Sequence, residues 1–142
     1  MDDPCTSPRV ELDDGLKRLV GDVMVKRPKT LPAEATVADL RRLFENPRVR
    51  TALLVDSGAL VGAIDRESLD PLVDGSERAD SHLAANLPTI APEATVSAAV
   101  ELLRQAGTRR LVVVDADGVT LRGLVCLDGR AQGFCTDAAD LG

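Results

Sequence analysis

The hydrophobic and polar positions in the first half of the chain predict a helix followed by a β-hairpin. Apolar residues recur at helical spacing over Val37–Phe44, behind Thr36 as an N-cap, and Asp39 completes a capping box. Two short apolar runs follow, Ala52–Val55 and Leu60–Ile64. Because a polar, glycine-containing turn separates these runs, they are expected to form two antiparallel strands.

The same order of elements recurs in the second half of the chain. Thr95 begins a helical pattern that Gly107 suits as a stop, and the strand-like runs Leu111–Val114 and Thr120–Val125 follow. The letters EATV occur at 34–37 and again, at an offset of 59, at 93–96. The chain is therefore expected to be a tandem repeat of the unit short strand, helix, strand, strand, helix.

The segments outside these patterns carry weaker signals. The N-terminal segment is expected to hold one helix after a disordered stretch at residues 1–9, and the first repeat is expected to end in a polar helix. The residues at helical spacing are Leu12, Leu16, Leu19 and Val23 in the N-terminal segment, and Glu67, Leu69 and Leu72 at the end of the first repeat. The run Gly129–Gly142 is expected to contain at most one short helix.

Composition restricts the core and the means of binding. The 142 residues suffice for one compact domain or two small packed repeats. The chain has no Trp or Tyr, and its only aromatic residues are Phe44 and Phe134. The core is therefore expected to consist of Leu, Val and Ala, with almost no aromatic surface for stacking on a base.

Charge and cysteine content restrict the partners and the compartment. A net charge of -6 argues against nucleic acid and against an anionic membrane surface, both of which require a basic face. No stretch approaches the roughly 20 apolar residues of a membrane span. The three cysteines, Cys5, Cys126 and Cys135, form no CxxC motif, which favours free thiols and a cytoplasmic location.

The sequence offers no set of residues suited to catalysis or metal binding. His82 is the only histidine, and it is expected to be a linker or surface residue. Cys126 as a nucleophile would lack a convincing base, so an inert strand cysteine is the preferred interpretation. Glu34 and Glu93 repeat ahead of the two helices, where acids favour the positive helix end. We expect a protein that is not an enzyme and holds no metal.

Several motifs, taken in order, resemble the cystathionine-β-synthase (CBS) domain. The first repeat has GDVM at 21–24, Thr30-Leu31, ALLVD at 52–56 and LVGAI at 60–64, and the second has TRRLVVVDADG at 108–118 and LRGLV at 121–125. The resemblance implies an α/β (α+β) fold of two tandem CBS repeats, a Bateman module. Each repeat would be a small sheet with two packed helices, and a pseudo-twofold axis would relate the two.

On this resemblance the chain divides into five parts. They are an N-terminal tail and helix at 1–19, CBS repeat 1 at 20–74, a linker at 75–80, CBS repeat 2 at 81–135 and a C-terminal tail at 136–142. Such modules commonly form homodimers and bind adenine nucleotides or S-adenosylmethionine in clefts between the repeats. A homodimer is also expected because the apolar helix faces around Val37 and Val96 would otherwise lack full cover.

The residues that would line these clefts depart from the family pattern Gly-x-x-Thr/Ser-x-x-Asp. Its final acid, which accepts hydrogen bonds from ribose hydroxyls, is replaced by Ser68 in the first repeat and by Gly129 in the second. The hydroxyl positions hold Asp65 and Cys126, and Asp128 lies one residue too early to substitute for the acid. Adenosine nucleotides are therefore expected to bind weakly or not at all.

A basic pair that commonly reaches a ligand's phosphates in this family is matched by Arg109-Arg110 in the second repeat. An equally weighted alternative is that these arginines are solvated strand-start residues. The full candidate ligand-binding set is Thr30, Arg50, Asp65, Ser68, Thr89, Arg109, Arg110, Cys126, Asp128 and Gly129.

Two functional hypotheses follow from the sequence. The first is a stand-alone regulatory CBS pair that senses a nucleotide or another phosphate-bearing small molecule. The alternative is a dimerisation or protein-interaction module with vestigial clefts. Arg109-Arg110 favour the first hypothesis, and the missing ribose acids favour the second. The expected partners are a second copy of the chain and an unidentified protein, with neither nucleic acid nor membrane.

Overall fold

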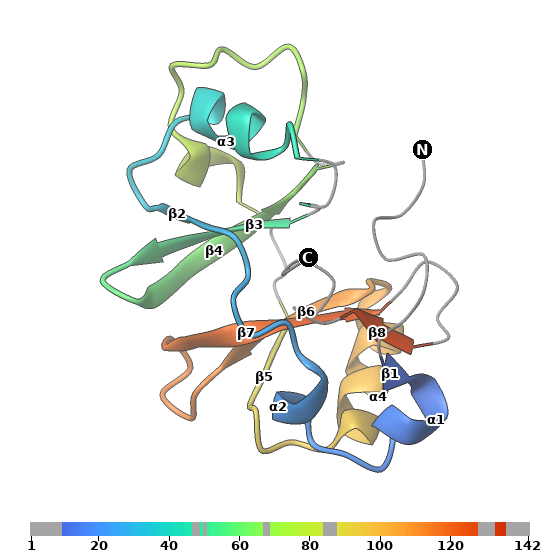
Figure 1. The fold of residues 1–142 in the computed structure, drawn as a ribbon. Helices are drawn as coiled ribbons and strands as arrows, with labels where there is room; N and C mark the ends of the chain where they lie inside the picture. The colour runs from blue at the N-terminus through green and yellow to red at the C-terminus, as the bar shows by residue number, and fades with distance from the viewer. Residues whose placement is uncertain are drawn as a thin grey trace. The chain divides into compact units, whose positions relative to one another are not determined.

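The computed structural model describes residues 10–46, 49, 51–66, 69–83, 88–127 and 133–135. The chain forms two compact units. Unit 2 is the continuous segment Lys29–Leu87, and unit 1 combines the chain before it with the chain from Pro88 onward. The elements of both units are labelled in Figure 1.

Unit 2 is built on a three-stranded sheet with one α-helix. The strand order is β2-β3-β4, with β2 parallel to β3 and the hairpin β3–β4 antiparallel. The elements are β2 (Thr30–Pro32), α3 (Val37–Leu43), β3 (Thr51–Asp56), β4 (Ala59–Asp65) and the 3-10 helix η2 (Ala79–His82). The hairpin turn places Ser57 and Gly58 at φ +52° and +84°, which explains the small residue at its tip.

The start of α3 confirms the capping box that the sequence predicts. The hydroxyl of Thr36 accepts from the N–H of Asp39 at 3.3 Å, and the Asp39 carboxylate accepts from the N–H of Thr36 at 3.0 Å. The helix packs Leu40 and Phe44 against one face of the sheet. From the sheet, Ala52, Leu54 and Ile64 complete this core.

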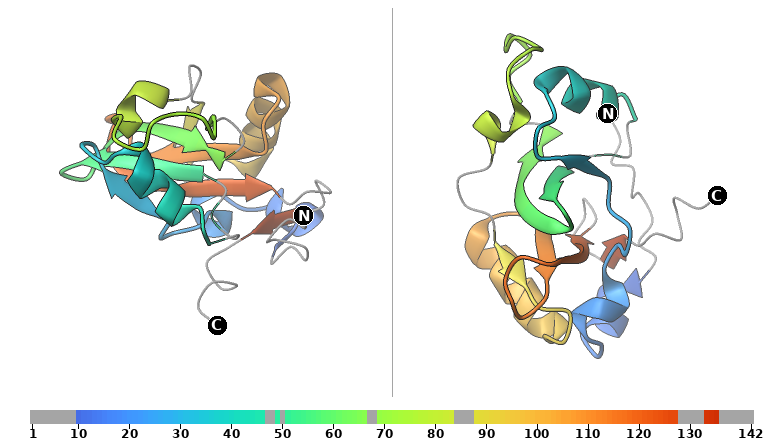
Figure 2. Two further views of the ribbon diagram at one scale, coloured as in Figure 1. Left: turned by 90° about the horizontal axis from the view of Figure 1, so that it is seen from above. Right: turned by 90° about the vertical axis from the view of Figure 1, so that its left-hand side faces the viewer.

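Unit 1 is built on a five-stranded sheet, in the order β1-β8-β7-β6-β5. Its strands are β1 (Val10–Glu11), β5 (Thr89–Ile90), β6 (Arg110–Val114), β7 (Leu121–Leu127) and β8 (Gly133–Cys135). Its helices are α1 (Leu12–Gly15), α2 (Val20–Val23) and α4 (Val96–Ala106). Figure 2 shows from two further sides that α4 lies along one face of this sheet.

The core of unit 1 lies between α4 and the sheet. Thr95 caps α4 through the N–H of Ala98, and Gly107 ends the helix at φ +67°, both as predicted. Val113, Val125 and Phe134 from the sheet are buried completely. They belong to one apolar cluster with the buried residues of α2 and α4. As the composition predicts, aliphatic side chains dominate both cores.

The start of the first repeat and the linker just before the second repeat each pack near the helix start of the other repeat. Val20 donates its N–H to the carbonyl of Ala94 in unit 1, and Ala79 donates its N–H to the carbonyl of Ala35 in unit 2. The two donors, Val20 and Ala79, are 59 residues apart, and so are the two acceptors, Ala35 and Ala94, which is the offset between the repeats. The compact units therefore divide the chain differently from the sequence repeats, whose boundaries remain a prediction.

The expected N-terminal helix is broken in the structure. The chain forms two four-residue helices, α1 and α2, with turns and an isolated bridge at Leu19 between them. Gly15 is buried so close to Phe134 that a Cβ there would lie 2.9 Å from the ring. Leu16 and Leu19 are 38% and 45% exposed, so they do not continue the apolar face that their spacing suggests.

The polar helix expected through Glu67, Leu69 and Leu72 does not appear in the residues of this segment that the structure describes. Residues 69–76 form turns and bends instead, while Glu67 lies outside the described residues. Pro71 supplies the reason, because its ring removes a backbone donor and disfavours a helical conformation at the preceding residue. The Asp70 carboxylate then accepts from the N–H of Leu72 at 2.9 Å, which stabilises a turn.

The C-terminal run contains a strand where at most one short helix was expected. Phe134 in β8 pairs with Leu127 of β7 and with Val10 of β1. These pairings join segments far apart in sequence, so local pattern does not reveal them. The expectation of disorder at residues 1–9 concerns residues outside those described. In the described part of the chain, no helix is long and apolar enough to cross a membrane.

Candidate functional site

Strand register places three of the candidate residues on one face of the unit 1 sheet. Arg110 of β6 lies opposite Cys126 of β7, and Thr89 of β5 lies opposite Val112 of β6. Side chains alternate between the faces of a strand. Leu111 and Val113 point into the core under α4, so Thr89, Arg110 and Cys126 share the other face.

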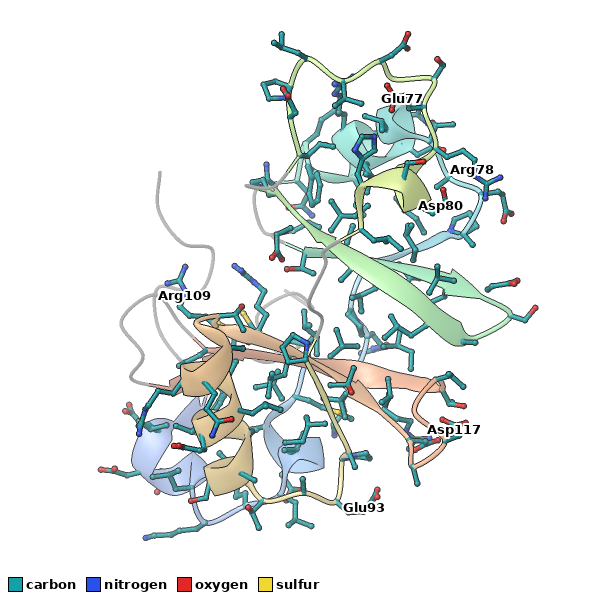
Figure 3. The ribbon with its side chains drawn as sticks, turned by 180° about the vertical axis from the view of Figure 1, so that it is seen from behind. Glu77, Arg78, Asp80, Glu93, Arg109 and Asp117 are labelled. Carbon is teal, nitrogen blue, oxygen red and sulfur yellow. The ribbon has the colours of Figure 1, made fainter. Side chains whose placement is uncertain are left out.

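The two arginines are fixed at the start of β6 through their backbone. The carbonyl of Arg109 accepts from the N–H of Leu127 at 2.9 Å, and the N–H of Arg110 donates to the Thr108 hydroxyl at 3.3 Å. Both side chains are half-buried, and Figure 3 shows Arg109 close to the start of this strand. Two guanidinium groups at one strand start suit a ligand with several anionic oxygens.

Unit 2 carries the equivalent face with different chemistry. Thr51 of β3 lies opposite Asp65 of β4, and Thr30 of β2 lies opposite Leu53. The Thr51 hydroxyl is buried and donates to Oδ1 of Asp65 at 2.6 Å. Thr51 therefore stands where unit 1 has Arg110, and part of the acceptor capacity of Asp65 is used within the unit.

Four of the sequence-predicted site residues lie outside the described part of the chain. They are Arg50, Ser68, Asp128 and Gly129. Their roles stay predictions. Of the described candidates, Thr89, Arg110 and Cys126 come together in unit 1, and Thr30 and Asp65 share a face in unit 2.

The expectation of free thiols is wrong for Cys135, which is disulfide-bonded. Cys126 forms no disulfide and is half-buried. Cys126 and Cys135 are cross-strand neighbours in β7 and β8. The odd number of cysteines and the lack of a CxxC motif predict reduced thiols. Their spacing does not reveal which segments distant in sequence come together.

The remaining polar side chains near η2 form pairs on the surface, labelled in Figure 3. His82 Nε2 lies 3.1 Å from Glu77 Oε1, and its side chain is 25% exposed. Arg78 Nη2 lies 2.8 Å from Asp80 Oδ2. Their hydrogen bond raises the pKa of Arg78 and lowers that of Asp80. The described residues contain no cluster of His, Cys, Asp or Glu that could hold a metal ion.

Sequence reasoning missed an open pocket in unit 2 that contains two more arginines. Its lining consists of Arg41, Phe44, Glu45, Arg66, Leu69 and Pro71. The sequence signal was the unexplained Arg66 directly after β4. Leu69 and Pro71 of this lining belong to the segment in which turns replace the expected polar helix.

Comparison with known proteins identifies the family. A family model for the CBS domain matches residues 20–70 and 81–128. No curated protein sequence matches the chain. Among solved structures, CBSX2 in complex with AMP is 25% identical with a TM-score of 0.68, over 76% of this chain and 89% of that one.

Two further structures share the fold. The CBS domain protein PAE2072 from Pyrobaculum aerophilum, complexed with AMP, is 21% identical with a TM-score of 0.67, over 77% of this chain and 87% of that one. The cytosolic domain of the Mg2+ channel MgtE, in complex with ATP, is 20% identical with a TM-score of 0.68. The match covers 78% of this chain but only 46% of the MgtE chain. With the family model matched twice in succession, the chain belongs to the CBS domain family and carries a CBS pair of mixed α/β fold.

Proposed function

We propose that this protein is a regulatory module that binds a nucleotide or another phosphate-bearing small molecule and performs no catalysis. The observation that carries the proposal is the shared sheet face of Thr89, Arg110 and Cys126 in unit 1, with Arg109 next to it. The disulfide at Cys135 removes the free-thiol argument for a cytoplasmic location, and we propose that location on the relatives instead. The matching part of the MgtE relative is likewise cytosolic.

The chemistry of this face favours phosphate over sugar. Arg110 offers a planar fork of donors that matches phosphate oxygens. Its strand neighbours on the same face, Val112, Leu124 and Cys126, include no carboxylate that would repel an anion. They also include no ionised acceptor for ribose hydroxyls. We therefore expect the phosphate groups to dominate binding, with weak discrimination among bases.

The relatives support a nucleotide as the ligand class. CBSX2 and PAE2072 were solved with AMP, and the MgtE domain with ATP. Each of these ligands carries the phosphate group that the two arginines suit. S-adenosylmethionine, which lacks a phosphate, is a weaker candidate for this chain on the same reasoning.

A thermal-shift series with AMP, ADP, ATP, S-adenosylmethionine and pyrophosphate tests the proposal. A ligand at 100 times its dissociation constant stabilises the folded state by about 2.7 kcal/mol. The double variant Arg109→Ala/Arg110→Ala should abolish any phosphate-dependent shift. The matched control is Arg104→Ala, because Arg104 lies on α4 of the same unit, 73% exposed and 3.4 Å from Glu101. An equal shift in the double variant would show that the site lies elsewhere.

A second candidate function is a dimerisation or interaction module with vestigial ligand sites. The hydrogen bond between Thr51 and Asp65 favours it for unit 2, because it occupies the polar groups that a ligand would otherwise use. A complete absence of shifts in the series above, together with a stable dimer, would support this function over ligand sensing.

We also propose a homodimer, but the structure does not support the argument from uncovered helix faces. The sequence argument assumed that the apolar faces of the two helices lack cover within one chain. Val37, Leu40, Val96 and Leu103 are in fact buried within their own units. The family resemblance is therefore the one remaining argument for a homodimer. Sedimentation velocity at tens of micromolar protein tests it, and a monomer there would contradict it.

A further inference from the structure

The open pocket beside α3 in unit 2 has features of a site for an acidic ligand. The chain after β4 runs beside α3 (Figure 1), and the space between them is about 540 Å³, including open solvent. Arg41 and Arg66 contribute two guanidinium groups to it, and Phe44, Leu69 and Pro71 contribute apolar surface. Among the described lining residues Glu45 is the one acid, so the two arginines give this part of the lining a net positive charge in a chain whose net charge is -6.

Arg66 is held in place before any ligand arrives. Its Nε and Nη2 donate to the carbonyl of Val49 at 3.2 and 2.6 Å, and Nη2 also donates to the carbonyl of Asn46 at 2.8 Å. The guanidinium carbon lies 5.1 Å from the centre of the Phe44 ring. These contacts fix the plane of the group and, within the described residues, use Nε and Nη2, which leaves Nη1 as the donor for a ligand.

Arg41 is also held by backbone carbonyls, here from the segment that contains Pro71 and Val73. Its Nη2 donates to the carbonyl of Pro71 at 3.0 Å and to the carbonyl of Val73. Within the described residues, neither Arg41 nor Arg66 has a carboxylate within ion-pair distance. Both positive charges are thus oriented by neutral carbonyls of the described chain. Binding loses less entropy when such side chains are already ordered.

The apolar surface continues outside the pocket. Leu72 directly follows Pro71 of the lining and is 90% exposed, the highest exposure among the large hydrophobic residues of the described chain. A small acid that fills the space between the arginines would leave Leu72 in water. A peptide segment can place its carboxylate in the pocket and an apolar side chain over Leu72 at the same time.

We propose that this pocket docks an acidic segment of a partner protein, in which an Asp or Glu side chain is flanked by apolar residues. The carboxylate pairs with Arg41 and Arg66, and the flanking side chains cover Phe44, Leu69 and Leu72. Charge complementarity supports this occupant, because arginine and carboxylate form strong charge-assisted hydrogen bonds. The site is separate from the unit 1 arginines of the proposed ligand site.

The test is a titration of the ¹⁵N-labelled full chain with the peptide acetyl-Leu-Asp-Leu-amide, followed by NMR. The expected result is saturable shifts confined to the backbone amides near 41–46 and 66–73. Acetyl-Leu-Asn-Leu-amide has nearly the same shape without the charge, and it should bind at least about 10-fold more weakly. Acetate distinguishes a small acid from a protein segment, and equal binding of acetate and the Asp peptide would overturn the proposed occupant.

Variants separate binding from folding. Arg66→Gln should weaken binding of the Asp peptide about 10-fold or more. It also removes hydrogen bonds to the carbonyls of Asn46 and Val49 that support the fold. Leu72→Ser changes an exposed side chain, leaves the fold intact and should still weaken binding several-fold. Arg42→Gln is the matched control, because Arg42 is 73% exposed and pairs with Asp39 outside the pocket. Unchanged affinity in Leu72→Ser, or no saturable shifts with the Asp peptide, would overturn the proposal.

Discussion

Val20 donates its backbone N–H to the carbonyl of Ala94 at 2.8 Å, which joins the start of the first sequence repeat to the helix start of the second. Ala79 makes the equivalent bond to Ala35 at 2.9 Å. The start of repeat 1 and the linker before repeat 2 therefore each join the compact unit that holds the other repeat's helix. Neither sequence repeat alone contains all the residues of one compact unit.

The first prediction concerns the buried side chain at this junction. Val20 is completely buried in the core of unit 1. Val20→Ala should lower the free energy of unfolding by about 2 kcal/mol, because it removes apolar contact and leaves a cavity. Val119→Ala is the control, since Val119 is 47% exposed. Urea unfolding measures both, and equal losses would show that the junction does not contribute as inferred.

The second prediction compares two glycines that occupy equivalent positions in β4 and β7. A Cβ on Gly123 would lie 2.5 Å from the carbonyl oxygen of Val25, whereas a Cβ on Gly62 would lie 2.8 Å from methyl groups of Leu83. The backbone carbonyl of Val25 cannot move away from an added methyl group as easily as the end of the Leu83 side chain can. Gly123→Ala should therefore destabilise the protein by about 1 to 3 kcal/mol, and more than Gly62→Ala does. The reverse order in urea unfolding would contradict this.

How far the sequence predicts the fold depends on whether a signal is local. The capping residues Thr36 and Thr95 and the stop at Gly107 predict α3 and α4 correctly, because caps act within one helical turn. The hairpins follow from pairs of short apolar runs, each pair separated by a polar turn that contains glycine. Pro71 also gives a local signal against the expected helix through Glu67, Leu69 and Leu72, which the apolar spacing alone does not reveal.

The parts that sequence reasoning missed depend on contacts between distant segments. β8 pairs with β7 and with β1, and Arg66 reaches the carbonyls of Asn46 and Val49 across the unit. Within the candidate site, alternation predicts that Arg110 and Cys126 share a face. Their alignment across the strands, however, depends on the bulge between Val113 and Val114, which the sequence does not specify.

The third prediction concerns the pH dependence of the α3 capping box. The backbone N–H and hydroxyl of Thr36, with Arg42 nearby, hold the pKa of Asp39 below its usual value of 3.8. A carboxyl whose folded pKa is depressed stabilises the protein above its unfolded pKa, and this contribution is lost as pH falls through the folded pKa. The charge-dependent stabilisation should therefore be complete near neutral pH and disappear below 3.8.

Unfolding of the parent protein and of Asp39→Asn at several pH values tests this dependence. The variant keeps an acceptor for the Thr36 N–H but carries no charge. The difference in unfolding free energy between the two proteins should shrink as pH falls below 3.8. Thr36→Ser keeps the hydroxyl and should retain the parent's pH dependence. Parallel curves for Asp39→Asn and the parent would contradict the assigned role of the carboxylate.

The last prediction is that adenosine nucleotides bind this protein weakly, because both ribose acids of the family pattern are replaced. Ser68 and Gly129 stand at those positions, outside the described residues. A hydrogen bond to a charged group contributes roughly 1.5 to 3 kcal/mol, so its loss weakens binding by about one to two orders of magnitude.

Restoring the acid should restore the affinity. Gly129→Asp should create or strengthen AMP binding next to Arg109 and Arg110, provided that residue 129 does not require a positive φ. Gly129→Asn is the matched control, because it has nearly the same shape without the charge. Calorimetry should then find at least a 10-fold tighter AMP complex in the Asp variant than in the Asn variant. Micromolar binding of AMP or ATP to the unaltered protein would contradict the prediction, since the arginines and backbone groups would then suffice without a ribose acid.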